Sequence, residues 1–253
     1  MIVTFLGTGT SQGVPVIACD CDVCTSLDYR DKRLRSSVHI QTKGKSFIID
    51  TGPDFRQQVL REDIRSLDAV IFTHEHKDHT AGLDDVRGFN FKQQRDMPLY
   101  ARPRVLAQLS QEFAYAFAEK KYPGVPMLET HEIDGSPFTV EGVEFIPIEV
   151  LHYKLPVYGF RIGDFVYITD CNHIPEEEKA KIKGAKVLVV NALQLEEHIS
   201  HFNLEQAVAV CNELGIERNY LIHMSHRLGR HMDIGRMLPD HIHLSHDGLK
   251  IEL

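Results

Sequence analysis

Three histidines and one aspartate lie within six residues of the sequence, at His74, His76, Asp78 and His79. Imidazole nitrogens and carboxylate oxygens suit zinc, manganese or iron. The apolar run Ala69–Thr73 precedes these residues, so they follow the end of a predicted strand, where ligands gather in α/β folds. Adjacent Asp78 and His79 leave the chain in different directions from His74 and His76, so the spacing predicts two metal ions.

A second cluster consists of three cysteines, Cys19, Cys21 and Cys24. Three thiols this close together can wrap one zinc ion, which prefers four ligands in a tetrahedron. In a reducing compartment such a pattern indicates a metal rather than a disulfide. The fourth ligand must come from elsewhere in the chain, and Cys171, Cys211 or a histidine are the candidates.

The composition places the chain among ordinary soluble globular proteins, with 253 residues, 43% of them hydrophobic and 25% charged. No apolar run approaches the ~20 residues of a membrane span, and the first residues do not form a signal peptide. We therefore expect a cytoplasmic protein that does not contact a membrane. The net charge of -8 disfavours nucleic acid as a partner, because such binding depends on Lys and Arg.

The elements that must position these side chains alternate between strands and helices. Apolar runs predict buried strands at Ile2–Leu6, Phe47–Asp50, Ala69–Thr73, Phe145–Leu151, Val166–Thr169, Val187–Val190 and Tyr220–Ile222. Turn residues predict hairpins at Lys43-Gly44, Glu141-Gly142 and Gly163-Asp164, and a last turn and strand at Asp247-Gly248 and Leu249–Leu253. Helices are predicted at Asp54–Arg61, Gly82–Gln93, Arg104–Lys120 and Asn203–Leu214. Many hairpins together with several βα units favour two sheets with helices outside.

The motif from His74 to Gly82, HxHxDHxxG, resembles the signature of the metallo-β-lactamase superfamily. The resemblance implies an α+β fold, the αββα four-layer sandwich, in which two mixed sheets pack face to face with helices outside. It places a dinuclear metal site along one edge of the sandwich. We expect residues 1–253 to form a single hydrolase domain of this kind, with a zinc-binding loop at residues 19–24.

Four further residues match the rest of the superfamily pattern, and all four follow predicted strands: Asp50, His152, Asp170 and His223. The resemblance implies that His74, His76 and His152 hold one ion. It implies that Asp78, His79 and His223 hold the other, and that Asp170 bridges the two. Asp50 is expected to orient the histidines, a common need at metal sites. Asp50 and Asp78 are therefore also counted as catalytic residues.

Other stretches give a closer resemblance. The segment Phe5–Pro15 followed by CxCxxC, together with Gly82–Phe89 and His223–His226, is similar to the phosphoribosyl cyclic phosphate phosphodiesterases of phosphonate breakdown, the PhnP-like family. The similarity runs from residue 3 to the C-terminus. It implies that His226 completes the cysteine cluster as the fourth ligand of a structural zinc. It also implies that His201 is a catalytic histidine, with His198 the weaker candidate.

The resemblance implies a dinuclear metal-dependent phosphoric diester hydrolase. Its substrate would be a small cyclic phosphate, of the phosphoribosyl 1,2-cyclic phosphate type, cleaved to a phosphate monoester by hydroxide held between two zinc or manganese ions. His201 would donate a hydrogen bond or proton to the phosphate or leaving group. The resembled relatives are often dimers, so a homodimer is one candidate assembly, and the sequence leaves the oligomeric state open.

Two other functions compete with this interpretation. A tRNA 3′-processing endonuclease of the same superfamily would carry a basic, glycine-rich arm, and no such insertion lies between His79 and His152. The acidic charge also disfavours RNA. A non-hydrolytic relative in cofactor biosynthesis is the second alternative, and the full set of seven ligands argues against it.

The remaining histidines and cysteines carry less information. We interpret these histidines as surface residues or as supports beside the site: His39, His131, His173, His231, His241, His243 and His246. Cys171 directly follows Asp170 and should point away from the metals. Cys211 lies inside a predicted helix and is expected in the core.

The sequence predicts a metal content. Protein purified without chelators should hold about three metals per chain, one of them zinc that resists mild chelation, because the ligand set brings carboxylates and thiolates together and needs cations to offset them. Elemental analysis after gel filtration measures this content. One metal or none per chain would contradict the two-site interpretation.

Overall fold

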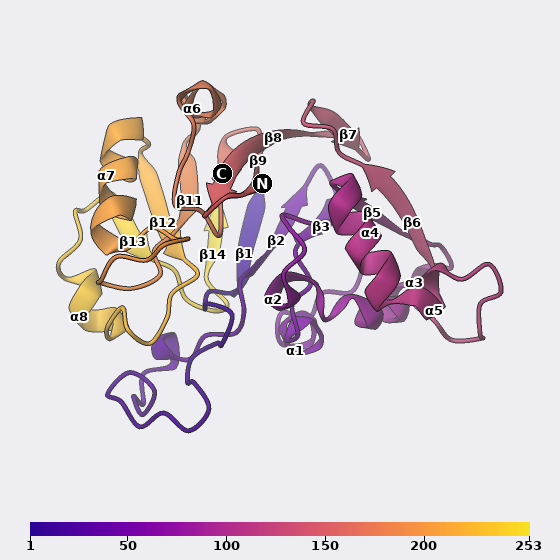
Figure 1. The fold of residues 1–253 in the computed structure, drawn as a ribbon, viewed down its shortest axis with the longest axis horizontal. Coiled ribbons are helices and arrows are strands. Elements are labelled where there is room, and N and C mark those ends of the chain that lie inside the picture. Colours follow the sequence, from indigo (N-terminus) through magenta and orange to yellow (C-terminus); the bar gives the residue numbers. More distant parts are fainter.

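A computed structural model describes residues 1–253 and contains two seven-stranded sheets with helices on their outer sides (Figure 1). The first sheet contains, in spatial order, β14 (Lys250–Glu252), β1 (Ile2–Gly7), β2 (Ser37–Thr42), β3 (Lys45–Ile49), β4 (Ala69–Ile71), β5 (Met97–Ala101) and β6 (Leu128–Glu132). The second contains β7 (Phe138–Val140), β8 (Val143–His152), β9 (Leu155–Ile162), β10 (Phe165–Tyr167), β11 (Val187–Asn191), β12 (Arg218–Ile222) and β13 (Ile242–Leu244).

The two sheets share one pairing pattern. In the first, the pairings from β14 to β3 are antiparallel and those from β3 to β6 are parallel. In the second, the pairings from β7 to β10 are antiparallel and those from β10 to β13 are parallel. Each sheet is therefore mixed, as expected.

Helices cover the outer face of each sheet. Those that follow strands of the first sheet are α1 (Phe55–Arg61), α2 (Lys77–Thr80), α3 (Arg87–Gln93), α4 (Pro103–Glu112) and α5 (Ala114–Phe117). Those of the second are α6 (Glu176–Ile182), α7 (Leu204–Leu214) and α8 (His231–Gly235). Short 3-10 helices occupy Tyr29–Asp31 and Leu83–Val86. The two groups lie on opposite sides of the molecule in Figure 1.

Three apolar layers hold these elements together. The layer between the sheets contains Phe5, Phe47, Phe145 and Phe160. Another apolar layer joins the first sheet to its helices, and a third joins the second sheet to its own. Three layers of core between four layers of secondary structure confirm the αββα sandwich.

The predicted elements are mostly confirmed, with two corrections. The predicted helix at Arg104–Lys120 is wrong as one continuous element, because α4 ends at Glu112, α5 covers only Ala114–Phe117, and residues 118–120 are not helical. Residues 118–122 bury no apolar side chain, and a helix depends on such a face. The predicted helix at Gly82–Gln93 begins as a 3-10 turn. The capping box at Asn203 and the left-handed Gly215 confirm the ends of α7. No helix is both long enough and apolar enough to span a membrane.

Residues at three strand ends adopt left-handed backbone angles. Asp50 follows β3 with φ 65°, Asp170 lies beyond β10 with φ 55°, and His223 follows β12 with φ 57°. Such angles are uncommon outside glycine and are tolerated best by Asn, Asp and His. The sharp turn at each strand end directs the side chain into the seam between the two sheets.

Two glycines allow the loop after β3 to touch the end of α2. A Cβ on Gly82 would lie 2.1 Å from the carbonyl oxygen of Gly52, and a Cβ on Gly52 would lie 2.2 Å from that of Asp78. Backbone hydrogen bonds join the same segments, from Thr51 N–H to His79 O and from Gly82 N–H to Thr51 O, both at 2.8 Å. This close approach places Asp50 beside His79.

Replacement of Gly82 tests this packing. Gly82→Ala should lower the free energy of unfolding by about 1–3 kcal/mol, because a methyl group has no room against the facing backbone. Gly88→Ala in α3 is the matched control, since nothing lies within 4 Å of that position. It should be neutral or stabilise by about 0.4–1 kcal/mol. Chemical denaturation measures the free energy of unfolding of both variants. Equal changes in the two variants would contradict this packing.

Candidate metal centre

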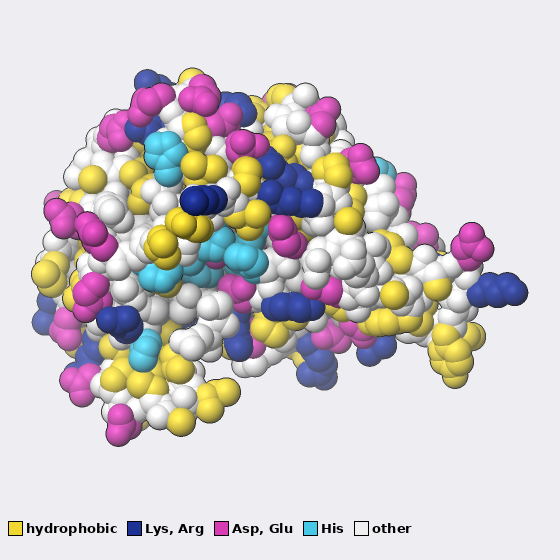
Figure 2. Space-filling model, in the orientation of Figure 1, with side chains coloured by type: hydrophobic (Ala, Val, Ile, Leu, Met, Phe, Trp, Pro, Cys, Tyr) yellow, Lys and Arg dark blue, Asp and Glu magenta, His cyan; other side chains and the backbone are white.

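The structure brings together all seven residues expected at a dinuclear site. Their donor atoms form two groups within 4.8 Å, His74 with His76 and His152, and Asp78 with His79, Asp170 and His223. An overlapping group, His152 with Asp170 and His201, places Asp170 between the two. Figure 2 shows histidine side chains gathered on this face of the molecule, with basic and acidic side chains nearby.

Four of these histidines use one ring nitrogen to bond a supporting group. The contacts are His79 Nδ1 to Asp50 Oδ2 (2.7 Å), His74 Nδ1 to Thr73 Oγ1 (2.9 Å), His152 Nδ1 to the Ser200 carbonyl oxygen (2.9 Å) and His223 Nε2 to Thr10 Oγ1 (3.2 Å). Such contacts fix the ring and its tautomer. The second nitrogen of each ring is left for a metal.

Two of the free nitrogens show that the site fits cations. His79 Nε2 and His223 Nδ1 are buried and have no hydrogen-bond partner. Yet His79 Nε2 lies 3.2 Å from an Asp78 oxygen, and His223 Nδ1 lies 3.0 Å from Asp170 Oδ1. Buried polar atoms without partners are rare, because each costs desolvation free energy. Divalent cations between these nitrogens and oxygens would satisfy them.

The charges of the site favour the same conclusion. Burial would raise the pKa of Asp170, but His223 and His79 outweigh burial and hold that pKa well below its usual range. Burial would lower the pKa of His79, but Asp78, Asp170 and Asp50 raise it well above its usual range. Without metals, a proton on His79 offsets the crowded carboxylates, whereas burial lowers the pKa of His223 to about 4 and that of His74 well below its usual range. Divalent metals can replace that proton.

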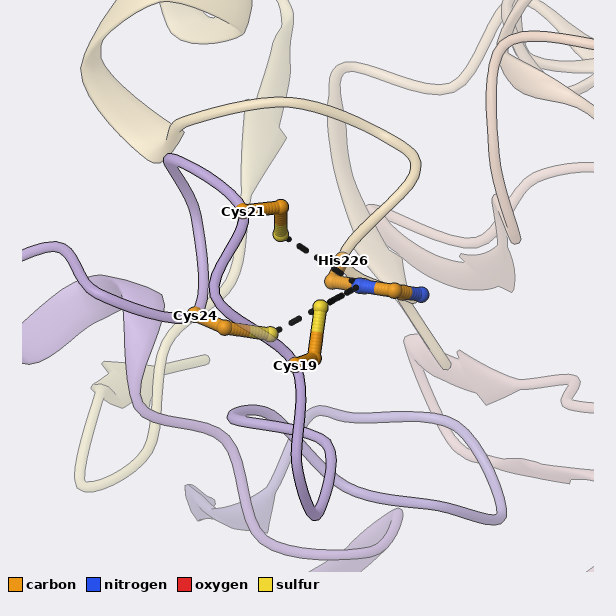
Figure 3. Close-up of side chains that lie close together, drawn as sticks. All are labelled: Cys19, Cys21, Cys24 and His226. Carbon is orange, nitrogen blue, oxygen red and sulfur yellow. Dashed lines mark hydrogen bonds between the residues drawn. The ribbon is translucent and has the colours of Figure 1, made fainter.

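The cysteine cluster has the dimensions of a zinc site. The Sγ atoms of Cys19, Cys21 and Cys24 lie 3.2, 3.4 and 3.6 Å from His226 Nδ1 (Figure 3). Tetrahedral zinc with ordinary Zn–S and Zn–N bonds separates sulfur from nitrogen by ~3.5 Å. All five cysteines are free, and Cys171 and Cys211 are buried in the core. Of the three candidates for a fourth ligand, the structure therefore brings the histidine to the cluster.

His201 lies closer to the metal centre than His198 does. Its Nε2 is 3.2 Å from Asp170 Oδ2, its ring stacks on that of His223, and its side chain is buried. His198 is exposed and contacts His201 through Nδ1, at 3.3 Å. The buried histidine is thus the one that lies beside Asp170.

Sequence reasoning missed the groups that orient the histidines. Thr73 directly precedes His74, so its position next to a ligand was a local signal that could have indicated its role. Thr10 and the Ser200 carbonyl lie far from their histidines in the sequence. His39 and His231, expected at the surface or beside the site, are buried and bond Ser46 and Arg33 instead.

The fold and the paired ligand groups define a metal-dependent hydrolase of the metallo-β-lactamase class. A family model described as "Beta-lactamase superfamily domain" matches residues 45–224. A solved structure described as a new diphosphatase from the PhnP family is 40% identical, with a TM-score of 0.93, and the match covers 100% of this chain and 97% of that one. The chain therefore belongs to the β-lactamase superfamily and, within it, to the PhnP family.

Two other proteins are similar to this chain. A protein of Porphyromonas gingivalis named octanoyltransferase is 42% identical over 97% of this chain, which spans about half of that protein's length. Zinc-bound PqqB from Methylobacterium extorquens is 21% identical, with a TM-score of 0.84 and 100% of both chains covered. The latter likeness shows a shared fold.

Substitution of one residue in each cluster separates their roles. Cys21→Ser should lower both the melting temperature and the zinc content, because a structural zinc contributes folding free energy. His76→Ala should lose turnover and metal at the dinuclear site while the fold remains, since His76 is exposed. Calorimetry measures the melting temperature, elemental analysis measures the metal content, and a hydrolysis assay measures turnover. An unchanged melting temperature and zinc content in Cys21→Ser would refute the structural role.

Proposed function

We propose that the protein hydrolyses a phosphodiester bond in a small cyclic phosphate and releases a phosphate monoester. The observation that carries this proposal is the seven-residue constellation, with the carboxylate of Asp170 shared between two histidine groups. Oxygen ligation of this kind accepts manganese as well as zinc. Full-length similarity to a PhnP-family diphosphatase supports chemistry at phosphorus.

In this proposal the chain holds three metals. His74, His76 and His152 would hold one, Asp78, His79 and His223 would hold another, and the Asp170 carboxylate lies among both groups of side chains. Cys19, Cys21, Cys24 and His226 would hold a structural zinc. Two divalent ions at the first site would activate water near neutral pH and neutralise charge that develops on the phosphate.

The side chains around the metals have distinct roles. Asp50, buried and bonded to Thr73 and His79, keeps the His79 ring in one orientation. His201 presents Nε2 to the same space as the Asp170 carboxylate, so it can hydrogen-bond a phosphate oxygen or pass a proton to the leaving alkoxide. Ser200 Oγ contacts the other nitrogen of His201 at 3.0 Å and restrains the ring.

The hollows beside the site favour a small substrate over tRNA. One of about 450 Å³ adjoins His76 and His152, and one of about 250 Å³ adjoins His201. The larger volume lies within the range of roughly 300–1,000 Å³ that is typical of small-ligand sites. A diphosphate is the closest alternative substrate, because the same apparatus cleaves a phosphoanhydride. Assays of cyclic ribose phosphate, a 2′,3′-cyclic nucleotide, a diphosphate and a tRNA precursor would rank the candidates, and activity on the tRNA precursor alone would refute the proposal.

His201→Ala should keep both catalytic metals and the fold yet lower kcat by about 10² or more, the usual contribution of a general acid. The loss should shrink for nitrophenyl diesters, whose leaving group needs little protonation. Steady-state kinetics and elemental analysis measure these effects, with His198→Ala as the control that does much less. Loss of a metal in His201→Ala would make His201 a ligand instead.

A further inference from the structure

A hollow of about 400 Å³ lies among the helices that cover the first sheet. It is bordered by α1, the turn that follows α1, and α3. Its volume is typical of small-ligand sites. None of its twelve lining residues belongs to the dinuclear cluster or to the cysteine cluster. The hollow is therefore separate from the chemistry described above.

The floor of this hollow is apolar. Phe55, Ile64 and Phe89 line it, and all three are buried in the apolar layer between the first sheet and its helices. Leu60 and Phe91 also line it, yet 61% and 60% of these residues stay exposed. An exposed apolar patch with a polar border indicates an interaction or ligand site. The hollow thus offers contact area to an apolar group.

The border of the hollow is cationic. Four cationic residues line it against one carboxylate, that of Asp85, and the four are Arg56, Arg65, Arg87 and Lys92. The whole chain has the opposite balance, with 36 Asp and Glu against 28 Lys and Arg. Positive charge concentrated at one hollow of an acidic protein favours a ligand with negative charge.

Several of these cations are available to a ligand. Arg56 is exposed and forms no ion pair. The Lys92 ammonium donates to the carbonyl oxygen of Arg65, at 2.8 Å, and to no carboxylate. Arg65 pairs with Asp63, but both side chains are more than two-thirds exposed, and exposed ion pairs are weak. A carboxylate would form charge-assisted hydrogen bonds with such groups.

The shape and charge of the hollow select among possible occupants. A second copy of this chain would bring the same patch against itself in a two-fold dimer, so that four cations would face four cations. A flat anionic membrane would contact Leu60 and Phe91 but would leave the buried floor at Phe55 unfilled. A small molecule with an apolar body and one anionic end fits both the floor and the border.

We infer that the hollow between α1 and α3 binds a small amphipathic anion, an alkyl chain of medium length that ends in a carboxylate. The chain lies on the apolar floor, and the carboxylate reaches the cations of the border. This site does not depend on the proposed phosphodiesterase function, and its test uses binding rather than turnover.

Calorimetry with decanoate, used below the concentration at which it forms micelles, tests the site directly. One decanoate should bind per chain. Decyltrimethylammonium has the same chain with a positive end and should bind about tenfold more weakly or worse, because it faces cations. Hexanoate should also bind about tenfold more weakly or worse, because it buries four fewer methylenes. Equal affinity for decanoate and decyltrimethylammonium would overturn the inference.

Two substitutions in the hollow should remove or weaken this binding. Gly88 lines the hollow, and nothing lies within 4 Å of a Cβ placed there, so Gly88→Leu fills the space and should abolish decanoate binding. Arg56→Glu should weaken it about tenfold or more. The matched control is Arg236→Glu, which changes an exposed arginine after α8 and should leave binding unchanged. Unchanged binding in Gly88→Leu and in Arg56→Glu would overturn the inference.

His76→Ala separates this site from the metal centre, because a carboxylate can also bind metals. This variant should bind decanoate as the wild-type protein does. Binding that is lost in His76→Ala and kept in Gly88→Leu would place the carboxylate at the metals and overturn the inference.

Two further measurements test the other occupants. Analytical ultracentrifugation shows whether Gly88→Leu dissociates a dimer, and sedimentation with phosphatidylglycerol vesicles shows whether Arg56→Glu releases the protein from a membrane. Neither change is expected. Either change, in a protein that does not bind decanoate, would assign the hollow to a second copy or to a lipid surface and overturn the inference.

Discussion

The carboxylate of Asp170 lies between histidines that follow strands of both sheets. Its oxygens approach four ring nitrogens, on His223 (3.0 Å), His201 (3.2 Å), His79 (3.4 Å) and His74 (3.9 Å). A buried carboxylate is costly unless positive charge surrounds it. The left-handed backbone at the strand ends and the close backbone approach at Gly52 and Gly82 bring imidazoles to this one carboxylate. Metal cations would add further positive charge around it.

Local patterns in the sequence predicted most of the fold, and the family resemblance supplied most of the site. Strand-end residues such as Asp50 and His152 were identified because they match the superfamily pattern, and each of them follows an apolar run. The helix at Asn203 was predicted well because its capping box and Gly215 are local signals. Strand β5, the edge strands β6 and β13 and the short helix α8 were not predicted, since they are short and are stabilised by neighbours in space.

Contacts between distant segments were beyond sequence reasoning. Thr10 bonds a histidine 213 residues away, and Ser200 supports one 48 residues away. Nothing in either local sequence indicates this role. The resemblance to a known family supplied His226 as the partner of the cysteines, because spacing alone left Cys171, Cys211 and any histidine open.

The two sheets, whose strands pair in the same order of antiparallel and parallel neighbours, divide the metal site between two halves of the chain. The first half contributes the cluster at residues 74–79, and the second contributes His152, Asp170 and His223. Neither sheet alone carries a complete set, so tight binding of the metal pair depends on correct docking of one sheet against the other. Metal uptake during folding thus reports when the two halves have joined, and a chain stalled with one sheet formed exposes a partial, weakly chelating cluster.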